Sequence, residues 1–278
     1  MPELKVGEIT LAYTDVGAGP AVILVHGSAA SRKQWRPLIE HLSGRYRCLA
    51  PDLIGYGRTT GWPADKKLSA KDEIALIAAL VDLFDGPVHL VGHSYGGSLC
   101  LDASLTLSHR LRSLTLIEPV AFQLLRLEGD SEAWAEIEDL ASRHIRFARE
   151  GRLAACADAM MSYWIGAAAW SAMPAEMRAA ITATMPKIAA EWQMAFDSDV
   201  GLSAFAGVTT PTLLIRGTHT TLAAHRVVAL LAKTLPRRDL IEIDGAGHMS
   251  PLTHAAEVSA AVAAHLERHA DSRAKDVA

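Results

Sequence analysis

The chain has 278 residues, half of them hydrophobic, and its 27 basic and 31 acidic residues leave a formal net charge of -4. A chain of this size can bury a large core, and α/β folds of this length often form one domain. The mild charge, without a basic block, argues against a nucleic-acid partner held through its phosphates. No apolar run approaches the ~20 residues of a spanning helix, and the first residues lack a signal-peptide pattern.

The cysteines bear on the compartment. Cys48, Cys100 and Cys156 are odd in number, widely spaced and without a Cys-x-x-Cys pattern. Such cysteines are typical of buried thiols in a reducing compartment rather than of disulfides or metal ligands. We therefore expect a cytoplasmic protein that needs no metal or cofactor. A membrane partner is not expected, and a homodimer stays an open alternative.

Apolar runs and helical patterns alternate along most of the chain. The predicted strands lie at residues 8–15 (an edge strand), 21–25, 47–50, 87–91, 111–117, 211–216 and 240–243. The predicted helices lie at residues 31–42, 68–84, 97–107, 222–235 and 255–266. This alternation predicts an α/β fold with a doubly wound, mostly parallel sheet, whose sites lie at the carboxyl ends of the strands.

The helix at 68–84 has a recognisable start. Ser69 is a candidate cap, and Asp72 and Glu73 fall in the first turn, where the helix dipole favours acidic side chains.

The alternation is suspended between residues 120 and 205. This stretch is rich in Ala, Met and Trp, and glycines and prolines interrupt a composition that otherwise favours helix. It also holds four of the six tryptophans, at positions 134, 164, 170 and 192. We predict a core formed by residues 1–119 and 206–278, with a helical insertion at 120–205 after the strand that ends at Glu118.

A Gly-x-Ser-x-Gly motif spans residues 92–96, between a predicted strand and a predicted helix. In that context the motif indicates a nucleophile elbow, a sharp turn that lifts the serine above the sheet. The glycines leave room for the strained backbone of such a turn. Ser94 is therefore the candidate nucleophile, and the backbone N–H of Tyr95, the next residue, is a candidate donor of an oxyanion hole.

A serine hydroxyl is a poor nucleophile until a base takes its proton. Twelve histidines are candidates for that base. His248 follows the last predicted strand in a loop that Gly245 and Gly247 allow to turn back over the sheet. We predict His248 as the base.

Four motifs in this order resemble the α/β-hydrolase superfamily. They are His26-Gly27 after a strand, the glycine-punctuated loop 51–58, the serine elbow and the final His loop. The insertion falls where that family places its cap, or lid. The resemblance implies a second oxyanion N–H from Ser28 and structural roles for His26 and His93. The Ser28 hydroxyl is either a third donor or simply part of a small side chain that the space requires.

The triad acid departs from the family pattern. Members usually carry Asp shortly after the strand predicted at 211–216, but this chain has Thr220 there and no acid from 217 to 233. Some members, including haloalkane dehalogenases, place the acid after the strand that follows the elbow helix, where this chain has Glu118. We predict that Glu118 orients His248. The alternatives are Asp244, or a water or Thr220 in place of an acid.

The resemblance also bears on the reaction. The related dehalogenases and epoxide hydrolases attack with a carboxylate, which Ser94 replaces, so we exclude both reactions. Carbon–carbon bond hydrolases usually have Trp after the catalytic His, where this chain has Met249. We expect a serine hydrolase of a small, largely apolar carboxylic ester. The alternatives are C–C, thioester or lactone hydrolysis, perhydrolysis, or ligand binding with vestigial activity.

The insertion is expected to line the substrate pocket, because ligand pockets are mainly apolar. We predict Phe122 and Trp164 of the insertion, together with Met249, as pocket residues. Four arginines of the insertion are candidates for binding a substrate carboxylate, although exposed helix faces explain them equally well: Arg126, Arg143, Arg146 and Arg152.

Overall fold

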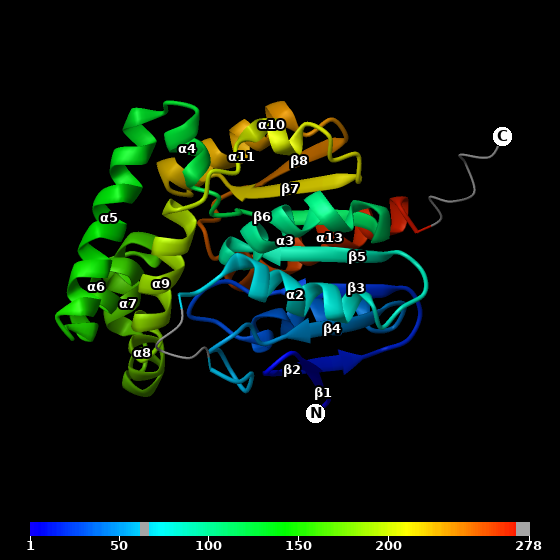
Figure 1. The fold of residues 1–278 in the computed structure, drawn as a ribbon, viewed down its shortest axis with the longest axis horizontal. Helices are drawn as coiled ribbons and strands as arrows, with labels where there is room; N and C mark the ends of the chain where they lie inside the picture. Colours follow the sequence, from blue (N-terminus) through cyan, green and yellow to red (C-terminus); the bar gives the residue numbers. More distant parts are fainter. Residues whose placement is uncertain (62–66, 271–278) are drawn as a thin grey trace.

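An eight-stranded sheet forms the centre of the protein (Figure 1). The computed structural model describes residues 1–61 and 67–270. The sheet order is β1-β2-β4-β3-β5-β6-β7-β8, and all neighbours from β4 to β8 run parallel. In chain order the strands are β1 (Glu3–Val6), β2 (Ile9–Val16), β3 (Ala21–Val25), β4 (Arg47–Pro51), β5 (Val88–His93), β6 (Leu111–Ile117), β7 (Thr212–Gly217) and β8 (Arg238–Ile243).

The predicted, mostly parallel sheet is confirmed, and one detail of its edge was wrong. The strand predicted at the edge, residues 8–15, is β2, which pairs with β4 on one side and with β1 on the other, antiparallel to both. The edge strand is β1, whose four residues include the charged Glu3 and Lys5. A run this short and polar carries too little alternation to identify a strand from sequence.

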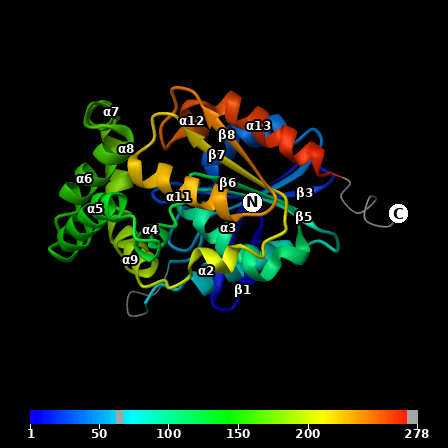
Figure 2. The ribbon, with the colours of Figure 1, turned by 90° about the horizontal axis from the view of Figure 1, so that it is seen from above.

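Helices cover both faces of the sheet (Figure 2). The helices α2 (Ala70–Val81), α3 (Ser94–Leu107) and α11 (Leu222–Thr234) pack on one face, and their apolar side chains share one buried cluster. On the other face lie α1 (Arg36–Leu42), preceded by a 3-10 turn (Arg32–Trp35), and α13 (Ala255–Arg268). The short elements η2 (Ser108–Arg110) and α12 (Ser250–Thr253) connect this framework.

Strand β3 shows why the central strands are apolar throughout. All five of its side chains are buried. Ile23 and Val25 contribute to the cluster under α2 and α3, whereas Val22 and Leu24 contribute to the cluster under α1 and α13. Because successive strand residues point to opposite faces, a sheet covered on both sides needs an apolar residue at every position.

Every described element between β6 and β7 is helical. These helices, here called the helical block, are α4 (Gln123–Leu127), α5 (Ser131–Arg149), α6 (Leu153–Ile165), α7 (Ala167–Ala172), α8 (Ala175–Thr182), α9 (Met185–Phe196) and α10 (Leu202–Phe205). Figure 1 shows α5 to α9 grouped beside the sheet, facing the carboxyl ends of β5, β6 and β7. The block therefore lies next to the strand ends that carry the sequence motifs.

Two further points concern the limits of the fold. None of the helices within the described ranges is both long and apolar enough to cross a membrane. Residues 271–278, the end of the predicted core part, lie outside the described residues.

Candidate active site

Ser94 stands at a sharp junction between strand and helix. Strand β5 ends at His93 and α3 begins at Ser94, whose φ of 55° lies in the left-handed region. A Cβ atom at Gly96 would come within 2.3 Å of the His26 carbonyl oxygen and 2.4 Å of the Val25 carbonyl oxygen. Only glycine therefore lets α3 begin this close to β3. The motif at 92–96 forms the predicted strand, turn and helix.

Backbone strain is concentrated at this site. Among the described residues, three non-glycine residues have positive φ: Ala29 at 56°, Ser94 at 55° and Glu118 at 42°. Ala29 belongs to the loop after β3, and Glu118 follows the last residue of β6. Such conformations cost on the order of 1–3 kcal/mol each, and they cluster where a structure must aim particular groups.

His248 connects Ser94 to Glu118. Its Nε2 atom lies 2.9 Å from Ser94 Oγ, and its Nδ1 atom lies 2.7 Å from Glu118 Oε2. All three residues are buried, with exposed fractions of 8%, 3% and 0% for Ser94, His248 and Glu118. The structure thus brings together the three residues that the sequence suggested, in the geometry of a serine–histidine–acid triad. The alternative acid, Asp244, is exposed and accepts a hydrogen bond from Thr218 at 3.3 Å.

Glu118 is held from both of its oxygens. The Gly217 N–H donates to Oε1 at 2.8 Å, and the Thr220 hydroxyl donates to Oε2 at 2.6 Å. Burial raises the pKa of Glu118, but the hydrogen bond and charge of His248, with the two other donors, outweigh it and leave the pKa below its usual value. Glu118 is therefore a carboxylate at neutral pH, and Thr220, at the usual position of the acid, supports it.

The end of β7 and the loop after it carry Gly217 and Thr220, two of the donors to Glu118. This segment lies close to the loop that carries His248. A Cβ atom at Gly217 would come within 2.0 Å of the Ala246 carbonyl oxygen. Glycine at the end of β7 therefore permits the contact between this strand end and the loop that carries His248.

The two expected oxyanion donors, Ser28 and Tyr95, both line the pocket beside Ser94. Tyr95 is in the first turn of α3, where backbone N–H groups have no partner within the helix. The Ser28 hydroxyl donates to Glu191 Oε2 at 2.5 Å. Its proton is thus directed at Glu191 of α9, so the idea of a third oxyanion donor from this hydroxyl was wrong.

A buried ionic cluster lies on the Ser28 side of the site. Lys187 Nζ is 3.0 Å from Glu73 Oε1 and 3.0 Å from Glu191 Oε1, and these three residues are called the Lys187 cluster below. The hydroxyl of Tyr56 donates to Glu191 at 2.7 Å, and that of Tyr95 donates to Glu73 at 3.3 Å. The cluster links α2 of the core to α9 of the helical block.

The cluster was not foreseen from the sequence. Glu73 lies in the first turn of α2, as predicted, but its side chain is fully buried, which was not expected. Burial raises the pKa of Glu73, which the charge of Lys187 only partly opposes. Burial lowers the pKa of Lys187, but Glu191 and Glu73 more than compensate, so the ammonium form is retained. The spacing of Lys187 and Glu191, four residues apart, was the available signal.

Two buried histidines support the loops of the site. His26 Nε2 accepts the Leu53 N–H at 3.0 Å, and His93 Nε2 donates to the His248 carbonyl oxygen at 2.9 Å. Burial lowers the pKa of His26 to about 4 and that of His93 to about 3, so both are neutral at pH 7. This is consistent with the structural roles that the resemblance implies for them.

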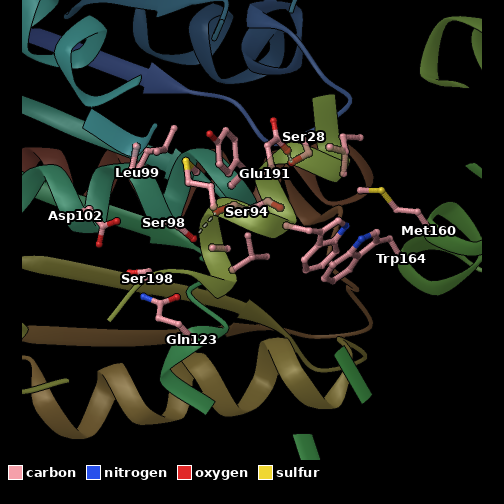
Figure 3. A pocket seen from close by; sticks show the side chains of 17 residues that line it. Ser28, Ser94, Ser98, Leu99, Asp102, Gln123, Met160, Trp164, Glu191 and Ser198 are labelled. Carbon is pink, nitrogen blue, oxygen red and sulfur yellow. Dashed lines mark hydrogen bonds between the residues drawn. The ribbon is translucent and has the colours of Figure 1, made fainter. Parts of the chain in front are cut away.

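A largely apolar pocket of about 710 Å³, part of it open to solvent, lies over Ser94 (Figure 3). The helical block contributes most of its apolar wall: Met160, Trp164, Ile188, Trp192, Met194 and Ala195. Trp164 stacks on the ring of His248 with 3.9 Å between centroids. The indole therefore covers one face of the imidazole.

Two of the three expected pocket residues lie elsewhere. Phe122 is fully buried behind the pocket wall, where it stacks on Trp164 and Trp192 at centroid distances of 6.3 Å and 5.9 Å. Met249 is half-buried and is not among the lining residues. Phe122 sits behind the wall because it belongs to the short turn that joins β6 to α4, beneath the two tryptophans.

The arginines of the insertion are engaged outside the pocket. Arg126 pairs with Asp199, Arg143 with Asp139 and Arg152 with Glu150, and Arg146 lies over the ring of Phe147. None of the four is among the pocket-lining residues. Within residues 1–61 and 67–270, no three His, Cys, Asp or Glu side chains gather as a metal site would require.

The sequence also matches known proteins. A family model described as the alpha/beta hydrolase fold matches residues 20–255. The chain therefore belongs to the alpha/beta hydrolase fold family, as the four motifs suggested.

Among curated relatives, the 2-hydroxy-6-oxo-2,4-heptadienoate hydrolase of Pseudomonas putida is 34% identical over 132 residues, which are 46% of this chain and 48% of that enzyme. The chain thus spans about half the length of that relative.

Among solved structures, the enol-lactonase from Burkholderia xenovorans LB400 has a TM-score of 0.79 at 21% identity, covering 96% of this chain and 100% of that one. A thermophilic esterase from Thermogutta terrifontis has a TM-score of 0.77 at 23% identity, covering 97% of this chain and 100% of that one. These two likenesses concern the fold.

Proposed function

We propose that the protein is a serine hydrolase that cleaves a small, largely apolar carboxylic ester through an acyl-enzyme on Ser94. One observation carries the proposal. His248 lies within hydrogen-bond distance of both Ser94, at 2.9 Å, and Glu118, at 2.7 Å, beside a mainly apolar pocket. A base that contacts both a nucleophile and an orienting acid is the arrangement that catalyses acyl transfer.

Acylation begins with proton transfer. Ser94 Oγ attacks the ester carbonyl while His248 Nε2 takes the hydroxyl proton. The backbone N–H groups of Ser28 and Tyr95 hold the oxyanion that forms. Glu118 stabilises the imidazolium and keeps the Nδ1 proton on its own side of the ring, which leaves Nε2 free to accept. His248 then protonates the leaving alcohol, and the acyl group stays on Ser94.

Deacylation repeats the steps with water. His248 removes a proton from a water molecule that attacks the acyl carbonyl, and Ser94 leaves with that proton. Trp164 stacks on one face of the His248 ring and so helps to keep water away from that face. We also propose that the helical block, residues 120–205, is the cap that limits access to this site. The site itself needs no metal or cofactor for these steps.

The pocket lining disfavours a substrate that carries a carboxylate. The relative from Pseudomonas putida is named for a heptadienoate, which carries a carboxylate. The described residues that line this pocket include Glu191 and Asp102 but no Arg, Lys or His. Glu191 is paired with Lys187, but Asp102 has no such partner among the described residues, so a substrate carboxylate beside it would meet like charge, which disfavours its binding.

A ligand-binding role with vestigial activity loses its sequence support. That alternative depended on a missing acid at Thr220. Glu118 supplies the carboxylate from another strand end, and Thr220 donates a hydrogen bond to it. A complete set of three groups favours turnover.

The test combines substitution with detection of the acyl-enzyme. Wild-type protein is expected to hydrolyse p-nitrophenyl butyrate, and Ser94→Ala is expected to lower kcat on the order of 10⁵-fold. A fluorophosphonate should label Ser94 in the wild type and leave Ser94→Ala unlabelled, while the two proteins unfold at the same temperature. Turnover that persists in Ser94→Ala contradicts the mechanism. Product analysis on thioester, lactone and C–C substrates identifies another bond if esters are poor substrates.

A further inference from the structure

Two acids line the pocket beside Ser94, and one of them, Asp102, lies eight residues further along α3. Ser94, Ser98 and Asp102 follow one another at intervals of four residues, which places them on one face of the helix, and all three line the pocket. Eight residues of helix span about 12 Å. Figure 3 shows Asp102 on one side of Ser94 and Trp164 on the other. Asp102 therefore lies on the side of the pocket opposite Trp164.

Asp102 differs from Glu191, the other acid in the lining. Both oxygens of Glu191 are engaged, since Tyr56 and Lys187 bond to Oε1 and Ser28 bonds to Oε2. Asp102 has no hydrogen bond or ion pair with any of the described residues. The neighbouring polar groups are directed elsewhere: Ser98 donates to the Ser94 carbonyl and Gln123 to the Val200 carbonyl, both at 3.4 Å.

An unpaired carboxylate in such a place has a physical cost. Apart from Asp102 and Glu191, the pocket is lined by apolar and uncharged groups, including Leu99, Val120 and Met194. Burial raises the pKa of Asp102 to about 6, so the carboxylate form still predominates at pH 7. A charge that is partly removed from water is stabilised by a cation in contact with it. The carboxylate of Asp102 is therefore available to a cationic group of a ligand in this pocket.

We propose that Asp102 is a specificity-determining residue that binds a primary ammonium group at the end of the substrate remote from the scissile carbonyl. The inference rests on the proposed ester hydrolysis and narrows its substrate class to esters with an amine-bearing arm. Ser98, whose hydroxyl is directed at the Ser94 carbonyl, and Leu99 lie between Ser94 and Asp102, where the methylene chain that joins the two groups would pass. The ammonium donates to Asp102, and its charge offsets that of the carboxylate.

The experiment separates binding from catalysis. The background is Ser94→Ala, and the probes are hexylammonium, hexanol and hexanoate, titrated with the fluorescence of Trp164 and Trp192 as the signal, since both indoles line the pocket. Hexylammonium is expected to bind at least about tenfold more tightly than hexanol, with hexanoate weakest, as for a hydrogen bond to a charged group. Asp102→Asn in this background should abolish the preference.

A charge-matched control and a second variant complete the binding experiment. Asp85 is exposed and precedes β5, so Asp85→Asn removes the same charge far from the pocket and should keep the preference. Asp102→Ser serves as the second variant if the asparagine protein folds poorly. The preference should also weaken as the pH falls below about 6, because a protonated Asp102 no longer offsets the cation. No preference in the parent protein, or one that survives both Asp102 substitutions, overturns the inference.

A kinetic experiment tests the substrate class itself. Wild-type protein is given two isosteric pairs: p-nitrophenyl 6-aminohexanoate against p-nitrophenyl heptanoate, and 6-aminohexyl butyrate against heptyl butyrate. At least one amino ester should have a kcat/KM about tenfold above its neutral partner, and Asp102→Asn should equalise them. Good turnover of neutral esters without an amine preference overturns the inference and leaves the proposed function standing. Absence of any ester turnover contradicts the proposed function. The binding experiment alone then decides whether Asp102 binds an ammonium group.

Discussion

Two buried polar clusters flank Ser94, and they differ in how their charge changes. On one side, Glu118 is a carboxylate that faces a histidine at 2.7 Å. In the proposed reaction that histidine gains a proton and loses it again. On the other side, Lys187 lies between Glu73 and Glu191, each 3.0 Å away, and these carboxylates raise the pKa of its ammonium group. The Glu118–His248 pair accommodates a histidine whose charge changes during the proposed reaction, whereas the charges of the Lys187 cluster stay the same.

The clusters also join different parts of the chain. Glu118 and His248 follow strands β6 and β8, so the core alone determines their distance. The Lys187 cluster joins α2 of the core to α9 of the helical block, and Glu191 holds the hydroxyl of Ser28. We therefore expect catalysis to depend on the first cluster, and the second cluster to position the helical block and the loop that carries Ser28. Three substitutions test this division.

The largest effect is expected from Glu118→Gln. Both oxygens of Glu118 accept hydrogen bonds, so the new amide NH₂ must face a donor whichever way it turns. If it faces Gly217, two N–H groups oppose each other. If it faces His248, Nδ1 becomes an acceptor and the proton moves to Nε2, where it blocks abstraction from Ser94. We expect kcat for p-nitrophenyl butyrate to fall on the order of 10⁴-fold.

The control is Asp244→Asn, which changes an exposed acid beside the same loop. Its kcat should stay within about twofold of wild type, as is usual for exposed positions. Equal losses in both variants would remove Glu118 from its assigned role.

Lys187→Met should act mainly on stability. The variant leaves two buried carboxylates without their cation, and breaking a buried pair in this way costs about 3–5 kcal/mol. We expect the free energy of unfolding in urea to fall by roughly this amount, with a loss of kcat far below that of Glu118→Gln. Replacing Glu73 and Glu191 by Gln in the same protein should restore much of the stability, because no buried charge then lacks a partner.

Lys233→Met on α11 is the matched control, since that lysine is exposed and its loss should leave the stability unchanged. A Lys187→Met protein as stable as wild type but inactive would reverse the division of roles between the two clusters.

The difference between the clusters also explains what could be predicted from sequence. Ser94, Glu118 and His248 each lie just beyond a strand, and parallel strands bring their carboxyl ends to one edge of the sheet. Their approach could therefore be predicted once the strands were recognised, although the same argument left Asp244, just beyond β8, as an alternative acid. Thr220 was interpreted as a missing acid, because its bond to Glu118 depends on the path of the loop after β7.

The contacts that involve the helical block were beyond prediction. Lys187 and Glu191 are four residues apart on a helix, a spacing that is also typical of exposed pairs, and only the packing of α9 against α2 buries them. Phe122 was expected in the pocket but lies behind the wall, since hydrophobicity alone does not distinguish a lining residue from a supporting one. The signal for Asp102 was present, because it is two helical intervals of four residues from Ser94.

The smallest effect is expected from Thr220→Val, which keeps the shape of the side chain and removes one of the three donors to Glu118. The remaining two, His248 and Gly217, should hold the carboxylate in place but orient it less firmly. A hydrogen bond to a charged group contributes about 1.5–3 kcal/mol, so kcat should fall about tenfold to a hundredfold, well short of the loss in Glu118→Gln.

Thr253→Val, which removes an exposed hydroxyl bonded to the Met249 carbonyl, is the control and should retain wild-type kcat. If Thr220→Val matched the loss in Glu118→Gln, the threonine would share the role of the acid instead of supporting it.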